Sequence, residues 1–113
     1  MRNDTLIRLN HIAESIRRIE SYTENIFLEE FEQSELIQDA VFKNLEIIGE
    51  AAYKLKNSYK LENSKIEWKK IEGLRHRLVH DYYEIDIEII WNTIQKRIPE
   101  LKSQIEEIRD NLK

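Results

Sequence analysis

Residues 34–61 read SELIQDAVFKNLEIIGEAAYKLKNSYKL, and this stretch decides the fold class. Apolar side chains recur in it every three or four residues, which is the period of one face of an α-helix. These positions are Ile37, Val41, Leu45, Ile48, Ala52, Leu55 and Tyr59. Ser34 precedes them and is a typical N-cap residue. We therefore predict one long amphipathic helix from Ser34 to about Leu61.

Gly49 lies in the middle of this predicted helix, with Ala51 and Ala52 beside it. A glycine inside a helix costs roughly 1 kcal/mol relative to alanine. Small side chains at one level of a helix allow a second helix to approach closely. We expect such an approach at Gly49.

The segment before this helix carries the same helical period. Its apolar positions predict an amphipathic helix over about residues 4–27, and they are Leu9, Ile12, Ile16, Ile19 and Ile26. Residues 28–33 are acidic, and we expect them to form a loop that leads into Ser34.

Three more helices are expected after residue 61. Polar residues 62–65 interrupt the pattern, and a helix over about residues 66–79 should bury its apolar positions, which are Trp68, Ile71, Leu74 and Leu78. Asp86 is expected to cap a fourth, short helix that contains Ile87, Ile90, Trp91 and Ile94. Pro99 fits the first turn of a fifth helix that ends at about Leu112.

The composition agrees with an all-α protein. Residues 1–113 give room for a single domain, and the chain contains only two glycines and one proline, which sheet-rich folds use often in turns. We predict an up-and-down antiparallel bundle of about five helices. The first two helices are long for so small a domain, so we also expect a homodimer that shares helix faces.

Targeting and redox signals are absent from the sequence. The chain has no cysteine, so it can form neither a disulfide nor a thiolate metal site. No apolar run approaches the roughly 20 residues that span a bilayer, and residues 1–20 lack the apolar centre of a signal peptide. We expect a cytoplasmic protein that does not bind membranes.

Charge is distributed unevenly along the chain. The net charge is −4, yet the segment from Lys65 to His80 has five basic and two acidic residues, a local balance of +3. A basic island on an acidic protein indicates a confined anion site better than an extended surface for duplex nucleic acid.

The island ends in the segment 73–83, which reads GLRHRLVHDYY. Histidine is the side chain best suited to proton transfer near neutral pH, and arginine binds phosphate oxygens through its planar group of donors. The segment has both types, Arg75, His76, Arg77 and His80, without an acidic pair or a metal cage, and this set suits cleavage of RNA by its own 2′-hydroxyl. A base would remove the 2′ proton, an acid would protonate the leaving 5′ oxygen, and a cation would stabilise the charge on phosphorus.

One imidazole cannot readily serve as base and acid on opposite sides of the phosphorus. A homodimer that presents two copies of His80 can do so, and this is our hypothesis for the reaction.

Other interpretations of these residues stay open. His76 and His80 have the spacing of helical zinc ligands, although Arg75 and Arg77 would repel a cation. His80 can instead be a histidine at a helix C-terminus, where the helix dipole favours the protonated ring. Arg75 and Arg77 can be surface bases paired with Glu72 or Asp81, which is the interpretation that we prefer for Arg77. Tyr82 and Tyr83 can be packing residues.

The segment also resembles the signature of HEPN domains, an arginine and a histidine separated by four to six residues. Arg75 and His80 fit it, and the tyrosine at Tyr82 is similar to the version found in HepT toxins. His76 follows the arginine, where the family most often has asparagine, and keeps a polar side chain there. The resemblance extends over nearly the whole chain, through segments 44–51, 66–75, 85–91 and 98–101.

The resemblance implies a single HepT-like domain over residues 1–113 and an endoribonuclease that needs no metal or other cofactor. Arg75 and His80 would be the catalytic pair, in a cleft between two protomers, with His76 as a possible accessory residue. The substrate would be RNA, with tRNA as a target class of the family. Glu50 would either orient Arg75 or lie on a solvated helix face.

The resemblance also implies a partner. Tyr82 would be modified with AMP by a cognate antitoxin, a minimal nucleotidyltransferase of the MntA type. The added bulk and negative charge would oppose RNA binding. The alternative function is a non-catalytic HEPN subunit that binds a nucleotidyltransferase and helps to present a substrate or nucleotide.

Overall fold

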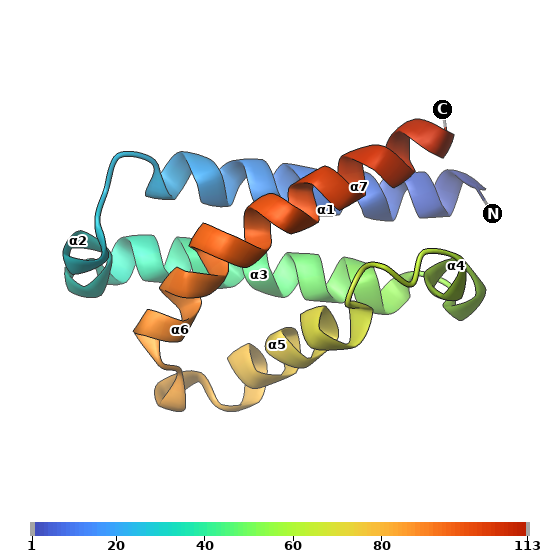
Figure 1. Cartoon of the computed structure of the whole chain (residues 1–113). Coiled ribbons are helices and arrows are strands. Elements are labelled where there is room, and N and C mark those ends of the chain that lie inside the picture. The colour runs from blue at the N-terminus through green and yellow to red at the C-terminus, as the bar shows by residue number, and fades with distance from the viewer. Residues whose placement is uncertain (1, 113) are drawn as a thin grey trace.

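The computed structural model describes residues 2–112 as helices joined by short turns, with no strand among these residues (Figure 1). Two long helices, α1 (Arg2–Thr23) and α3 (Glu35–Lys54), lie side by side with opposite directions. α5 (Trp68–His80) packs on α3, and α7 (Ile98–Leu112) packs across α1. The expected all-α bundle is confirmed, and α3 is its centre because it contacts both α1 and α5.

The predicted apolar faces form the core. The α1 residues Leu9, Ile12 and Ile19 are fully buried, and Ile16 is nearly so. On α3 the buried positions include Val41, Leu45, Ile48 and Ala52. Burial of each Val, Leu or Ile side chain contributes about 1.5–3 kcal/mol, so these two stripes supply much of the driving force for folding. None of the helices among residues 2–112 is long and apolar enough to cross a membrane.

The first helix ends earlier than expected, and the predicted loop contains a helix. α1 ends at Thr23, and Asn25 then adopts a left-handed backbone conformation (φ 62°), which asparagine tolerates well. Residues Leu28–Gln33 form the short helix α2. Its first turn is closed by Phe27, whose backbone N–H donates to the Glu30 carboxylate at 3.0 Å, and Phe31 is fully buried. The prediction of a loop over residues 28–33 was therefore wrong.

The helix that starts after Ser34 has the predicted cap but is shorter than predicted. The Ser34 hydroxyl accepts a hydrogen bond from the Ile37 N–H at 3.1 Å. The helix stops at Leu55, which is buried in an extended conformation, and α4 (Asn57–Glu62) follows. At this break the Ala52 carbonyl accepts from the Leu55 N–H at 3.2 Å and from the Lys60 ammonium at 3.1 Å, and Lys60 also pairs with Glu72 at 3.0 Å. The predicted continuous helix to Leu61 is therefore wrong.

The last part of the chain is more continuous than expected. Tyr82–Glu84 form the 3₁₀ turn η1, and Asp86 caps α6 (Ile87–Asn92) by accepting from the Glu88 N–H at 2.9 Å, as predicted. The π-helical turn η2 (Thr93–Arg97) joins α6 directly to α7. Pro99 does lie in the first turn of α7. Proline has no N–H to donate to the preceding turn, so a wider turn before it costs less.

The close approach predicted at Gly49 is present, and α5 is the helix that approaches. A Cβ atom on Gly49 would overlap Cβ of Arg75 and would lie 3.1 Å from its Cγ and 3.2 Å from the Ile71 carbonyl oxygen. Gly49 is itself buried. The absence of a side chain at this position therefore sets the distance between α3 and α5.

This packing predicts opposite effects for alanine at the two glycines. Gly49→Ala should lower the free energy of unfolding by roughly 1–3 kcal/mol, because overpacking outweighs the gain in helix propensity. Gly73 is the matched control, since it is exposed on α5 and a Cβ there meets nothing within 4 Å. Gly73→Ala should stabilise by up to about 1 kcal/mol. Urea unfolding at fixed protein concentration measures both, and equal effects would contradict this account of the contact.

Candidate active site

Arg75 is held where α5 crosses α3. One terminal nitrogen of its guanidinium, Nη2, lies 2.7 Å from Oε2 of Glu50, whose other oxygen lies 3.4 Å from Lys54 Nζ. The Arg75 side chain is about one third exposed. Since a guanidinium carries five N–H donors, this ion pair leaves several of them for another anion. Of the two interpretations of Glu50, the structure supports the one in which it orients Arg75.

Arg75 opens on a hollow of about 380 Å³ between α1, α3 and α5. Four other side chains that can carry positive charge line it, namely Arg8, His11, Lys43 and Lys54. The sequence analysis missed Arg8, His11 and Lys43, because they lie more than thirty positions from the motif and only the packing of α1 and α3 brings them near it. We name this the α1–α3–α5 hollow.

The two motif histidines lie together at the end of α5. The rings of His76 and His80 have centroids 4.5 Å apart, and both residues are exposed. Within residues 2–112 neither imidazole forms a hydrogen bond or an ion pair. His80 is the last residue of α5, as the helix-terminus interpretation requires. Both rings are therefore open to contact with a ligand.

Arg75 and His80 leave α5 in different directions. Five residues of α-helix turn the side-chain direction by roughly 140°. In this chain Arg75 faces the hollow, while His80 lies beside His76. One chain therefore does not place the predicted pair side by side.

Arg77 does not have the partners that we predicted for it. Glu72 is engaged by Lys60 instead, and Arg77 forms no ion pair within the described part of the chain. It is an exposed base on α5 outside the α1–α3–α5 hollow. The expectation that Arg77 pairs with Glu72 or Asp81 was wrong.

Tyr82 is anchored to α3, whereas Tyr83 is not. The Tyr82 hydroxyl donates a hydrogen bond to Oδ1 of Asp39, and its ring meets Phe42 edge to face with centroids 5.7 Å apart. Tyr82 nevertheless stays 41% exposed, and Tyr83 is 98% exposed. The hydrogen bond to Asp39, with smaller contributions from burial and from the charge of Asp39, raises the pKa of Tyr82 to about 12. The hydroxyl is thus neutral, accessible and fixed in place.

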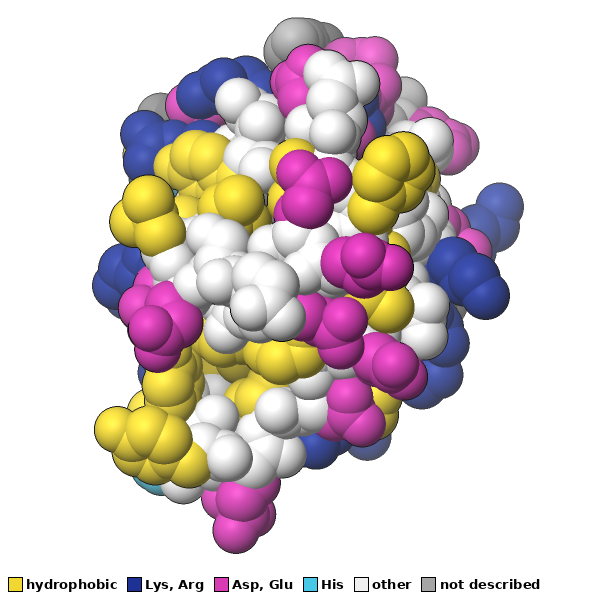
Figure 2. Space-filling model, turned by 90° about the vertical axis from the view of Figure 1, so that its left-hand side faces the viewer, with side chains coloured by type: hydrophobic (Ala, Val, Ile, Leu, Met, Phe, Trp, Pro, Cys, Tyr) yellow, Lys and Arg dark blue, Asp and Glu magenta, His cyan; other side chains and the backbone are white. Residues whose placement is uncertain are grey.

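Acidic side chains gather at the end of the molecule that carries α2. Figure 2 views this end, where the Asp and Glu side chains cluster and most Lys and Arg side chains lie at the margins. α2 itself contributes Glu29, Glu30 and Glu32. The acidic end and the basic hollow are therefore separate parts of the surface.

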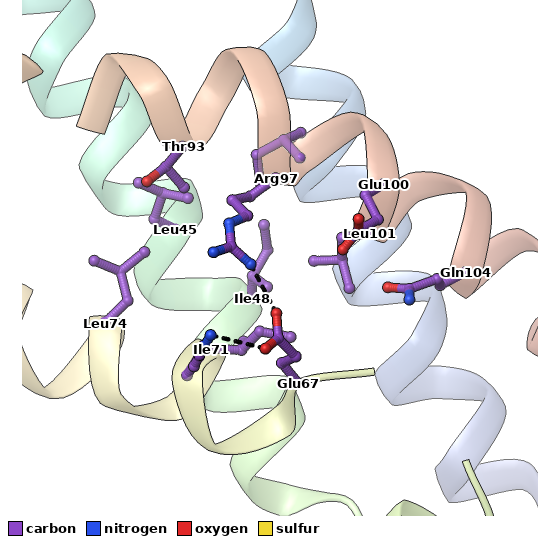
Figure 3. A pocket seen from close by; sticks show the side chains of 12 residues that line it. Leu45, Ile48, Glu67, Ile71, Leu74, Thr93, Arg97, Glu100, Leu101 and Gln104 are labelled. Carbon is purple, nitrogen blue, oxygen red and sulfur yellow. Dashed lines mark hydrogen bonds and ion pairs between the residues drawn. The ribbon is translucent and has the colours of Figure 1, made fainter. Parts of the chain in front are cut away.

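A second hollow, of about 230 Å³, lies between α5, η2 and α7 (Figure 3). Its wall is largely apolar, with Leu45, Ile48 and Ile71 among the lining residues. Glu67 bridges it, accepting from Arg97 at 2.7 Å and from Lys70 at 2.8 Å. None of the histidines lines it, so we do not assign the active site there. No group of three or more His, Cys, Asp or Glu residues able to hold a metal ion occurs within residues 2–112.

Comparison with known proteins adds a consistent set of relatives. Residues 12–108 match the family model described as Ribonuclease HepT-like. The chain is 38% identical to the Probable ribonuclease HepT of Thermococcus cleftensis over 89% of this chain and 92% of that protein. It is also 38% identical to a protein of Caldanaerobacter subterraneus subsp. tengcongensis named as a candidate RNase, over 88% of this chain and 89% of the relative.

A longer relative occurs in Methanocaldococcus jannaschii, named as a gamma-glutamylcyclotransferase and candidate RNase. It is 39% identical over 99% of this chain, which spans only 50% of the relative's length. No solved structure matches the chain significantly.

The bond between Tyr82 and Asp39 predicts how the tyrosine titrates. This hydrogen bond stabilises the folded protein fully at pH values below the ordinary tyrosine pKa of about 10. The stabilisation is lost as the pH rises towards 12, because Tyr82 of the unfolded chain ionises at a lower pH than Tyr82 of the folded chain. Asp39→Asn should move the pKa of Tyr82 back towards 10, and Glu35→Gln, which removes a weaker influence, should move it less. NMR titration of ¹³C-labelled tyrosine, assigned with Tyr82→Phe, measures this. Equal shifts in both variants would contradict the anchoring by Asp39.

Proposed function

The chain belongs to the HepT-like ribonuclease family, and from this premise we propose that it is a metal-independent endoribonuclease toxin in which Arg75 and His80 are the catalytic residues. One observation carries the proposal. The Arg75 guanidinium, oriented by Glu50 at 2.7 Å, opens on a basic hollow, and two unpaired imidazoles lie exposed on the same helix. A cation and proton-transfer groups are the two components that cleavage by the 2′-hydroxyl requires.

The reaction follows from these groups. An imidazole takes the proton of the ribose 2′-hydroxyl, and the 2′ oxygen attacks the adjacent phosphorus. The bond from phosphorus to the 5′ oxygen breaks, and an imidazolium gives a proton to that oxygen. The products are a 2′,3′-cyclic phosphate and a 5′-hydroxyl. Arg75 stabilises the negative charge that develops on the phosphoryl oxygens, which is the larger part of catalysis in many such sites.

A homodimer supplies what one chain lacks. Because Arg75 and His80 point in directions that differ by roughly 140°, a phosphate on one Arg75 is more readily reached by His80 of a second protomer. Val79 lies between them on α5 and is 49% exposed, and Tyr83, in the turn η1 that follows α5, is 98% exposed. Apolar side chains at such exposure favour burial against another chain. His76, beside His80, is an accessory proton-transfer group in the same cleft.

We further propose that modification of Tyr82 with AMP by a minimal nucleotidyltransferase antitoxin silences the enzyme. The Tyr82 hydroxyl is accessible and fixed by Asp39, as an acceptor for group transfer must be. Once AMP is attached, the Tyr82 oxygen has no proton to donate to Asp39, and the Asp39 carboxylate repels the phosphate. The adduct would leave the acidic side of Tyr82 and turn towards the positive charge of the hollow, where it would exclude RNA.

One observation favours the alternative, a non-catalytic subunit that binds a nucleotidyltransferase. Within residues 2–112 neither His76 nor His80 has a hydrogen-bond partner that would orient its ring, and general bases are usually oriented by such a partner. The cleavage assay below separates the two functions, because a scaffold needs neither imidazole.

We predict that Arg75→Ala and His80→Ala each lower single-turnover cleavage of RNA by roughly 10²–10⁴-fold. Arg77→Ala is the matched control, since it removes an exposed arginine of the same helix outside the hollow, and it should keep near-normal activity. Activity should survive EDTA. The wild-type and Arg77→Ala proteins should arrest growth when expressed without a partner, and the other two should not. Wild-type activity in both alanine variants, or its loss in EDTA, would refute the proposed mechanism.

We also predict that incubation with the partner nucleotidyltransferase and ATP adds mass to the protein in multiples of one AMP group. Tyr82→Phe should abolish the addition. Tyr83→Phe should leave the addition unchanged. Tyr83 is more exposed than Tyr82, but its hydroxyl is not fixed by Asp39. Intact-protein mass spectrometry reads all three proteins. If modification persists in Tyr82→Phe and disappears in Tyr83→Phe, the acceptor is Tyr83 and the assignment of Tyr82 is contradicted.

A further inference from the structure

The α1–α3–α5 hollow has a regular construction. Its floor is the exposed stripe of α3, where Lys43, Ile47, Glu50 and Lys54 follow at helical spacing. α1 forms one side through Arg8 and His11, which are three residues apart and so share a face. α5 forms the other side through Arg75. All three walls are helices packed through the core, so the basic groups are held on rigid elements.

The charge in the hollow is opposite to that of the whole protein. Arg8, Lys43, Lys54 and Arg75 face two carboxylates, Glu46 and Glu50, and His11 adds a group that can be cationic. Glu50 is already committed to Arg75 and Lys54. Within the described residues, Arg8, His11 and Lys43 have no hydrogen-bonding or ion-pair partner among side chains. Unneutralised cations on a protein with a net charge of −4 indicate a place for an anionic ligand.

The shape favours a single strand. From Lys43 to Lys54 the floor is roughly 16 Å long, at 1.5 Å per residue, and helices border it on two sides. A basic groove of this length follows the backbone of a few nucleotides. Arg75 lies at the α5 side, so a strand with one phosphate on Arg75 continues over Lys43 towards α1.

We propose that Arg8, His11 and Lys43 bind the RNA backbone next to the phosphate that is cleaved. Arg8 and Lys43 contact neighbouring phosphates, and His11 donates a hydrogen bond to a phosphate oxygen. They position the substrate and take no part in the proton transfers. The inference rests on the proposed ribonuclease function and adds to it the path of the substrate on α1 and α3.

The same stripe of α3 connects the hollow with Tyr82. Asp39, which holds the Tyr82 hydroxyl, precedes Lys43 by one helical turn, or roughly 6 Å along α3. A phosphate attached to Tyr82 therefore lies within a short distance of Lys43. The RNA backbone and the phosphate on Tyr82 would therefore compete for the positive charge of Lys43.

The test measures binding separately from cleavage. A fluorescent oligonucleotide with 2′-O-methyl groups throughout cannot be cleaved by its own 2′-hydroxyl, and its affinity for the wild-type protein is measured by anisotropy at several salt concentrations. Arg8→Gln and Lys43→Gln should each weaken binding and lower the slope of log affinity against log salt by about 0.7, the value for one phosphate contact on a single strand. His11→Gln should weaken binding with little change of slope. Lys96→Gln, outside the hollow, is the control and should match the wild type.

Single-turnover cleavage of the matching RNA completes the design. In the three variants, a higher protein concentration should be needed to reach the half-maximal cleavage rate, while the rate at saturation should be nearly unchanged. This is the result expected when a substitution removes a residue that binds the substrate without taking part in the chemical step. Unfolding curves close to the wild type confirm that the exposed substitutions keep the fold.

Each failure has a different signature. If the wild type binds the oligonucleotide and the three variants bind it more weakly, but no RNA is cleaved, the proposed function fails and the binding site stands. If the wild type cleaves RNA while the three variants bind and cleave as it does, the inference about the hollow is overturned. It is also overturned if the wild type does not bind the oligonucleotide, or if the variants lose binding only because the oligomer dissociates, as sedimentation would show. In that last case the hollow would be a contact between protein chains.

Discussion

The close contact between α3 and α5 at Gly49 is the constraint on which the site depends. Without a side chain at Gly49, the stem of Arg75 lies directly on α3, and the guanidinium then reaches Glu50 in the next position. A glycine in mid-helix would otherwise be a loss of roughly 1 kcal/mol. Here it allows one arginine to be fixed by packing at its base and by an ion pair at its tip. Preorganised charge of this kind is worth more to catalysis than a mobile surface arginine.

α3 also connects the parts of the site that belong to different regions of the sequence. Its exposed stripe carries Asp39 against Tyr82, Lys43 in the hollow and Glu50 against Arg75. Its buried stripe packs on α1, and this packing positions Arg8 and His11. The residues proposed for substrate binding, catalysis and regulation would therefore all be positioned by one rigid helix. A negative group added at Tyr82 would act over about one helical turn, without any change of fold.

Much of the fold could be predicted because helical period and capping act locally. The buried faces of α1 and α3, and the caps at Ser34 and Asp86, follow from side chains within a few positions of each other. The errors arose where tertiary contacts overrule local preference. Leu55 ends α3 by turning into the core, and α2 forms because Phe31 is buried. Chemistry and the family resemblance selected the motif residues, and their catalytic role stays a prediction. Arg77 was paired wrongly, because Lys60 pairs with Glu72 instead. Arg8, His11 and Lys43 gave no signal beyond their charge.

The most direct measurement of the central claim is a crystal structure of the protein with a 2′-deoxy analogue of an RNA that it cleaves. Such a strand lacks the attacking hydroxyl and stays intact in the site. We predict a phosphate within hydrogen-bonding distance of the Arg75 guanidinium, with Glu50 still on its other side and a His80 imidazole of a second protomer facing the same phosphate. A strand bound elsewhere, with Arg75 and His80 both remote from every phosphate, would contradict the assignment of this pair.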